Sequence, residues 1–145
     1  MLETKMAQVD MGDSMVRAWN MGTLAKKQRN PKTGATKDIL TGADWNEGIQ
    51  NNNRTATSTI NETIGGDDVT DWARFQVRFP VRVNLVTDNA IAAIVSSSRS
   101  VVVDSDDGYS SNLTAILQTG IYFLQFSSES SVTSLFTSQL TLTKV

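Results

Sequence analysis

Residues 71–79 alternate between apolar and polar side chains, and this alternation is the strongest local pattern in the chain. The apolar positions, from Ala73 to Phe79, fall on one side of an extended backbone. A period of two predicts a half-buried β-strand, and Pro80 ends it because proline cannot donate to a continuing ladder. The aromatic stretch 120–126 has a similar character, so we expect these two strands at the centre of one core.

From Thr57 onward, short runs of this kind follow one another. Val, Ile, Thr and aromatic residues dominate the runs, and clusters of Gly, Pro, Asp, Asn and Ser separate them. We expect strands at 58–64, 72–79, 81–87, 90–95, 100–103, 112–117, 121–127 and 135–143. No helical pattern of useful length interrupts them, so the sequence predicts an all-β fold, an antiparallel β-sandwich of the jelly-roll type with about eight strands.

Residues 1–57 lack this strand-like texture. The segment from Ala25 to Lys37 contains five cations, no acid and no aliphatic side chain larger than alanine. Such a composition is typical of a solvated loop. We therefore expect two parts: an extended, loop-rich N-terminal arm over residues 1–57 and a β-sandwich domain over residues 58–145.

Composition limits the chemistry available to this chain. Its 145 residues include no cysteine and no histidine, and its formal net charge is −2. Disulfides are excluded, and the commonest general base is absent. No nucleophile elbow or phosphate loop occurs. We expect no enzyme, no catalytic residue and no nucleic-acid partner.

Hydropathy gives no sign of a membrane partner either. The longest purely apolar run is 90–95, which is too short to span a bilayer. Residues 1–5 are not followed by the apolar core of a secretory signal peptide. We therefore expect a protein that stays in the cytosol or leaves by a route that needs no signal, such as release of virus particles by lysis.

The order of several short motifs resembles the bacterial pre-peptidase C-terminal domain. That family has an LGTL-like segment, a turn with two acids, a strand of the form D-x-(aromatic)-x-F, a late hairpin containing G-x-Y, and a closing strand. The matching segments here are 21–24, 64–71, 71–77, 117–126 and 136–142. The resemblance implies a jelly-roll-like sandwich and a non-catalytic accessory or binding module, usually outside the cell. The strand 89–95 departs from the family's pattern because it lacks the acids found there.

Three aspartates around the turn 64–71 are candidate calcium ligands. Asp67, Asp68 and Asp71 together offer the several oxygen ligands that Ca²⁺ requires. The alternative is that Asp67 and Asp68 form an Asx-type turn and Asp71 ends the loop. We expect the turn, with no cofactor and no metal ion; calcium bound by these aspartates is the alternative.

The candidate interface residues lie in the N-terminal region. Tryptophan is a frequent anchor in interfaces, but an isolated tryptophan can also fold back onto a core, so both alternatives stay open. The cations of the basic segment suit contact with an acidic neighbouring subunit. The interface candidates are Trp19, Leu24, Lys26, Lys27, Arg29 and Trp45.

These observations favour a structural or interaction protein. Our first hypothesis is a virion protein, a capsid cement or decoration protein whose N-terminal arm laces onto neighbouring subunits, including the major capsid protein or other copies of itself. The alternative is an extracellular module that binds polysaccharide or protein, with calcium assistance. A third hypothesis is a subunit of a self-assembling fibre or sheath.

Overall fold

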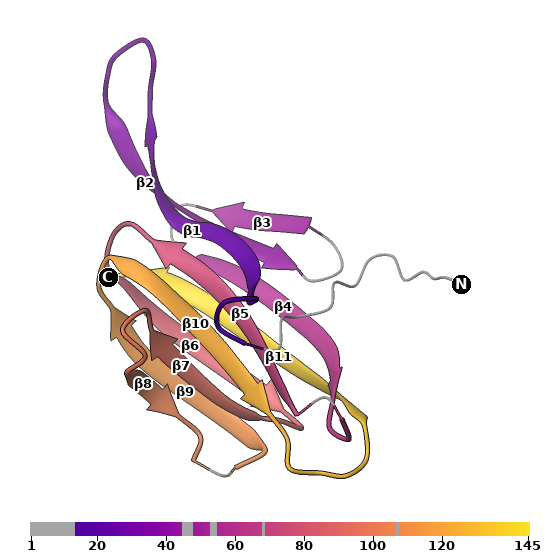
Figure 1. The fold of residues 1–145 in the computed structure, drawn as a ribbon. Coiled ribbons are helices and arrows are strands. Elements are labelled where there is room, and N and C mark those ends of the chain that lie inside the picture. Colours follow the sequence, from indigo (N-terminus) through magenta and orange to yellow (C-terminus); the bar gives the residue numbers. More distant parts are fainter. Residues whose placement is uncertain (1–13, 45–47, 53–54, 68, 107) are drawn as a thin grey trace.

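The fold is described from a computed structural model. It covers residues 14–44, 48–52, 55–67, 69–106 and 108–145, with the backbone alone considered at 41–44 and 48–52. The described chain forms two β-sheets that pack face to face, with a hairpin that projects beyond them (Figure 1). An all-β sandwich is therefore confirmed.

The larger sheet has seven strands in the order β3-β2-β1-β5-β10-β7-β8. Their bounds are β1 Trp19–Arg29, β2 Thr36–Asp44, β3 Gly48–Asn52, β5 Thr70–Val77, β7 Ile91–Ser96, β8 Val101–Asp104 and β10 Gly120–Ser127. Its pairings are antiparallel except for the one between β1 and β5, which is parallel.

The smaller sheet has four strands in the order β4-β11-β6-β9, and its pairings are all antiparallel. Their bounds are β4 Thr55–Ile64, β6 Val81–Asp88, β9 Ser110–Leu117 and β11 Ser134–Lys144.

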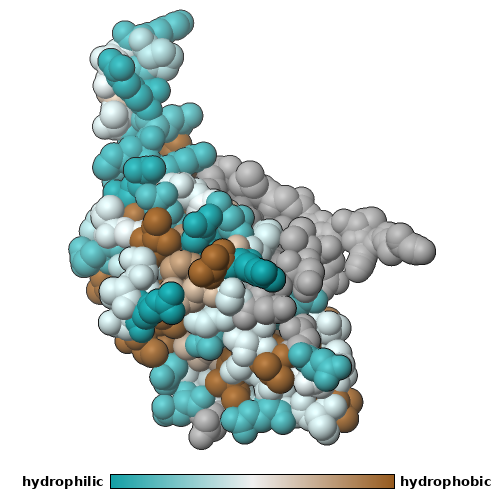
Figure 2. Space-filling model, viewed as in Figure 1, coloured by the Kyte–Doolittle hydropathy of each residue, from teal (hydrophilic) through white to brown (hydrophobic). Residues whose placement is uncertain are grey.

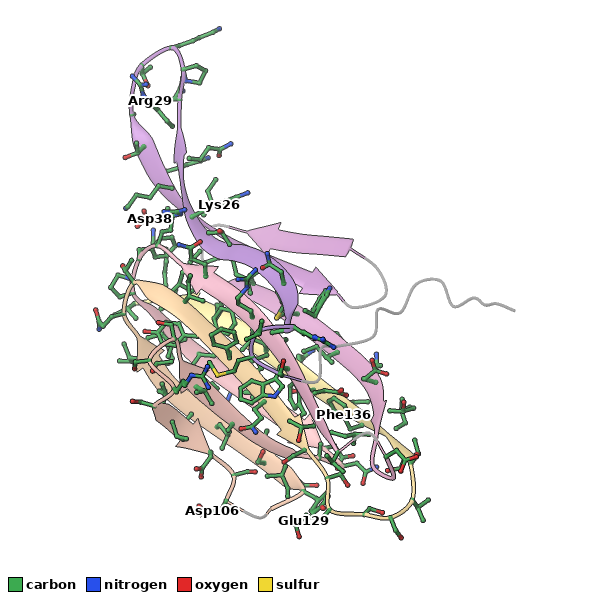
Figure 3. All side chains as sticks on the ribbon, in the orientation of Figure 1. Lys26, Arg29, Asp38, Asp106, Glu129 and Phe136 are labelled. Atoms are coloured by element: carbon green, nitrogen blue, oxygen red, sulfur yellow. The ribbon has the colours of Figure 1, made fainter. Side chains whose placement is uncertain are left out.

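The core fills the space between the two sheets. In β5 every second side chain, including Phe75, is fully buried, as the alternation of apolar positions dictates. The neighbouring β10 contributes Phe126, whose ring centroid lies 4.9 Å from that of Phe136 in β11. Phe136 is labelled in Figure 3. The aromatic strands β5 and β10 lie at the centre of the core, as expected, and they pair side by side in the larger sheet.

Each strand expected between residues 58 and 143 is present, with small shifts at its ends. Most of these strands are recognisable because one face is buried and the other is not, which produces the period of two in the sequence; β7 and β8 do not follow this pattern. Strand β6 is the clearest case, with Val81, Val83 and Leu85 buried and the residues between them more exposed.

The N-terminal region differs from the expected loop-rich arm. Strand β1 pairs with β5 on one side and with β2 on the other, so it is an internal strand of the larger sheet. The boundary expected at residue 57 also falls inside β4. The arm was inferred from a segment rich in lysine, but Met21, Leu24 and Ala25 bury their side chains in the sandwich core.

Candidate functional site: a projecting basic hairpin

Strands β1 and β2 form a hairpin whose base is anchored in the core. Leu24 and Leu40 are buried, and Ala25 lies opposite Leu40 in the ladder. The N–H of Arg78 donates to the carbonyl of Ala25 at 2.7 Å, which ties the hairpin to the end of β5. Leu24 was expected at an interface, but it is 3% exposed and packs in the core, so it is not available to a partner.

Beyond this base the hairpin leaves the sandwich. Pairing continues from Lys26 opposite Ile39 to Arg29 opposite Thr36, and every residue from Lys26 to Lys37 is exposed. In Figure 1 the hairpin stands clear of both sheets, and in Figure 2 the same part of the surface is almost entirely hydrophilic. The basic segment is therefore exposed as expected, but it is an ordered hairpin rather than a loop.

The tip of the hairpin is organised by Asn30. Its N–H donates to the carbonyl of Ala35 at 2.7 Å, and its carbonyl accepts from the N–H of Gly34 at 2.8 Å. Its side-chain Oδ1 accepts from the N–H of Lys32 at 2.8 Å. Gly34 adopts φ 75°, a conformation that favours glycine. This network gives the tip a defined shape.

The cations of the hairpin are not equivalent. Lys27 Nζ lies 2.7 Å from Asp38 Oδ1 and 5.8 Å from the centroid of the Phe79 ring, so it is engaged within the protein. In the part of the chain that the structure describes, no ion pair neutralises Lys26 or Arg29. Successive side chains of a strand point to opposite faces, and Lys26 and Arg29 are three positions apart in an unbroken register, so they lie on opposite faces of the hairpin.

Two hollows adjoin the hairpin and gather further cations. One, of about 520 Å³, is lined by residues 28–32 and 35–37 at the tip. The other, of about 430 Å³, is lined by Lys27, Thr36, Lys37, Asp38 and Lys144. Lys144 belongs to the last strand, β11, so its place beside the hairpin could not be foreseen from sequence proximity.

The two tryptophan candidates have different outcomes. Trp19 is partly buried and packs against the main core, which favours a tryptophan folded back onto the core over an interface anchor. Trp45 lies outside the described residues.

The structure describes two of the three candidate calcium ligands. Asp67 is exposed in the turn before β5, whereas Asp71 is fully buried within β5. Asp68 lies outside the described residues. Within the described ranges, no three His, Cys, Asp or Glu side chains gather closely enough to share a metal ion. The described residues also form no helix that is long and apolar enough to cross a membrane.

A second candidate surface lies on the outer face of the larger sheet, where a hollow measures about 410 Å³. Trp72 projects from this face of β5, and its ring meets the ring of Phe123 edge to face with centroids 6.3 Å apart. The lining residues are Ser14, Met15, Val16, Trp72, Val95, Arg99, Val101 and Gln125. The alternation of residues 71–79 predicts that Trp72 points away from the core, but nothing in the sequence indicates a hollow around it.

Comparisons with known proteins bear on the fold. No family model matches the sequence, and no curated protein matches it. Among solved structures, the chain is similar to the pre-peptidase C-terminal domain of a collagenase from Bacillus anthracis, with a TM-score of 0.51 and 16% identity. The match covers 57% of this chain and 86% of that domain. The resemblance seen in the sequence motifs is therefore confirmed for the fold: the chain contains a β-sandwich like that of the pre-peptidase C-terminal domain.

Proposed function

We propose that this chain is a non-enzymatic interaction module that attaches to an acidic surface of another protein through its β1–β2 hairpin. The observation that carries the proposal is the hairpin itself, whose exposed cations extend beyond the sandwich while its base is fixed in the core. A rigid base lowers the entropy that the hairpin loses when it binds. Exposed, unpaired cations suit the charged rim of an interface, where they steer association.

A protein surface is a better partner for this hairpin than nucleic acid. Residues 26–37 contain no aromatic side chain on which a base could stack. The whole chain is also weakly acidic, with residues 61–145 holding nine Asp or Glu and five Lys or Arg. This distribution opposes broad contact with a polyanion but leaves the hairpin as a local basic element.

The finer form of the proposal concerns the assembly in which the module acts. We propose a virus capsid, with the chain as a cement or decoration protein and the major capsid protein as partner. A small β-sandwich with a projecting hairpin and no histidine or cysteine suits a protein that reinforces a shell built from other subunits.

The test uses the full chain and a fluorescently labelled poly-glutamate peptide as an acidic protein-like probe. Lys26→Glu combined with Arg29→Glu reverses two hairpin charges, and Arg82→Glu combined with Arg99→Glu makes the same change of net charge elsewhere. Each exposed ion pair contributes up to about 1 kcal/mol, so the hairpin variant is expected to bind about ten- to thirtyfold more weakly. The control variant is expected to stay within about threefold of the parent chain.

Salt and a second probe sharpen this test. Raising the salt concentration is expected to weaken binding of the parent chain, because exposed charges are screened. Equal weakening by both variants would contradict a role for the hairpin. Equal affinity for a DNA duplex of the same charge would contradict the choice of a protein partner.

A second candidate function is favoured by the hollow around Trp72. An aromatic ring beside Arg99 and Gln125 on an open sheet face offers a stacking surface together with hydrogen-bond donors. On this alternative the chain is a module that binds an extracellular polysaccharide. Affinity electrophoresis in gels containing dextran or alginate tests it: Trp72→Ala should remove any retardation, whereas an unretarded parent chain would reject both polysaccharides as ligands.

A further inference from the structure

Strand β9 forms an open edge of the smaller sheet. It pairs with β6 along an unbroken register from Ser110 opposite Asp88 to Leu117 opposite Val81. Within the described residues, no strand pairs with its other side. Figure 1 shows β9 at the margin of the sandwich, away from the hairpin. One row of backbone donors and acceptors is therefore directed outward.

This edge lacks the features that usually prevent a strand from pairing with another chain. Its sequence, Ser-Ser-Asn-Leu-Thr-Ala-Ile-Leu, contains no charge and no proline, and its ladder contains no bulge. The nearby edge strand β8 is shorter, and its register with β7 is broken by a shift between Ile94 and Val95. Edge strand β4 differs again, because β2 and β3 lie against it more extensively than β8 and β7 lie against β9.

The orientation of the outward groups follows from the ladder. The N–H of Asn89 donates to the carbonyl of Tyr109 at 2.7 Å, next to the first pair of the β6–β9 register. In an antiparallel ladder, bonded and non-bonded pairs alternate. The residues that turn their N–H and C=O groups to the open side are therefore Ser110, Asn112, Thr114 and Ile116.

We propose that two copies of this chain pair through their β9 edges about a two-fold axis, so that their smaller sheets become one continuous antiparallel sheet. The axis passes beside Leu113, which then faces Leu113 of the second copy. Asn112 lies opposite Thr114 of the second copy, and Ser110 lies opposite its Ile116. The outward groups of these residues form about eight backbone hydrogen bonds between the copies.

The side chains suit this self-pairing. Leu113 is buried at the rim of the core, and Ile116 is 49% exposed on the outer face, where the second copy would cover it. Ser110 donates to Asp88 at 2.8 Å, and Ile116 lies opposite Arg82 in the ladder. The row that contains Ser110 and Ile116 of the second copy ends at Asp88 on one side and at Arg82 of the second copy on the other, with both β9 strands between these charges. Because β9 carries no charge, pairing with a second copy sets no like charges opposite each other, and it places Leu113 against Leu113 and covers Ile116; these matches favour a second copy over an unrelated strand.

The test measures the oligomeric state of the full chain by sedimentation velocity over a wide range of concentrations. Because a sheet edge alone buries less than a standard interface, we expect a reversible dimer that forms at about 10–100 µM. Thr114→Pro removes an outward N–H without breaking the ladder to β6, and is expected to weaken dimerisation at least about tenfold. Thr114→Val keeps the N–H and is the matched control, with dimerisation expected to be unchanged.

A cross-linking variant keeps the proposal testable if Thr114→Pro does not fold. The chain has no cysteine, so Asn112→Cys combined with Thr114→Cys introduces the only thiols. Directly opposite residues of a bonded antiparallel pair have Cα atoms about 5.5 Å apart, which suits a disulfide. Mild oxidation is expected to give a covalent dimer, whereas Gln139→Cys, at the middle of the same sheet, is expected to give none.

The proposal is overturned if the parent chain stays monomeric throughout the concentration range. It is also overturned if a dimer forms that Thr114→Pro does not weaken and the paired cysteines do not cross-link. A dimer abolished by Lys26→Glu combined with Arg29→Glu, but not by Thr114→Pro, would instead assign self-association to the hairpin.

Discussion

Replacing Leu40 by alanine tests whether the β1–β2 hairpin is part of the sandwich. Leu40 lies in β2, is fully buried, and belongs to the same continuous core cluster as Leu140 of the smaller sheet. Truncating a buried leucine removes its transfer free energy and leaves a cavity, which together destabilise a protein by about 2–5 kcal/mol. Since Leu40 is at the base of the hairpin, where the surroundings are held by β1 and β4, we expect a loss of about 3 kcal/mol.

Urea unfolding at low protein concentration measures this loss. The expected result is a lower midpoint with an unchanged m-value. For a chain of this length, a loss of about 3 kcal/mol corresponds to a fall in Tm of about 6–12 °C. Leu140→Ala is the matched core variant and should cost a similar amount. Lys37→Ala, on the exposed part of the hairpin, should stay within about 0.5 kcal/mol of the parent chain.

An unchanged unfolding midpoint for Leu40→Ala, together with a clearly lower midpoint for Leu140→Ala, would contradict a hairpin that is anchored in the core. That result would separate the hairpin from the cooperative unit and restore the expected independent arm. A second, earlier transition seen in the parent chain by tryptophan fluorescence alone would lead to the same conclusion.

Two further stability predictions concern positions with particular backbone or hydrogen-bond demands. Gly65→Ala should lower the free energy of unfolding by more than about 2 kcal/mol, because Gly65 adopts φ 105° and a Cβ there would lie 2.5 Å from the carbonyl oxygen of Val132. Gly22→Ala is the control, with φ 92° but nothing within 4 Å of the added Cβ, and it should cost only about 1 kcal/mol. Equal losses for the two variants in urea unfolding would contradict the steric clash at Gly65. Ser138→Ala should lower the free energy of unfolding by about 1–3 kcal/mol, since it removes the hydroxyl that lies 2.8 Å from the buried hydroxyl of Thr87. An unchanged Tm in thermal unfolding would contradict this expectation.

The sandwich could be predicted because its strands carry their own burial pattern. In β11, Phe136, Leu140 and Leu142 are buried and the residues between them are mostly polar. This alternation lies within a single stretch of sequence, so it predicts the strand even when the partner strands are unknown. The central place of β5 and β10 in the core was also expected from their aromatic side chains, whereas their direct pairing is seen only in the structure.

The hairpin strands could not be predicted in the same way. The outer half of β1, from Lys26 to Arg29, has solvent on both faces, so it shows no alternation between apolar and polar residues. Its strand conformation depends on pairing with β2, and the inner half depends on parallel pairing with β5, which lies about fifty residues away in the sequence. A sequence rich in lysine therefore resembled a loop.

The candidate site was only partly foreseen for a related reason. Lys26, Lys27 and Arg29 were singled out by their charge, and the structure places them on one hairpin. Lys144 joins them from the far end of the chain through the packing of β11. The hollow beside Trp72 depends on residues from several strands, and no local pattern reports such a juxtaposition.

The most direct test of the proposed hairpin interaction is a residue-resolved NMR titration of the ¹⁵N-labelled chain with an acidic poly-glutamate peptide. Chemical-shift changes are expected at the backbone amides of residues 26–37, they should fade as salt is added, and β5 and β10 should be unaffected. Changes confined to the surroundings of Trp72 and Gln125, or no changes at all, would contradict the assignment of the hairpin as the interaction site.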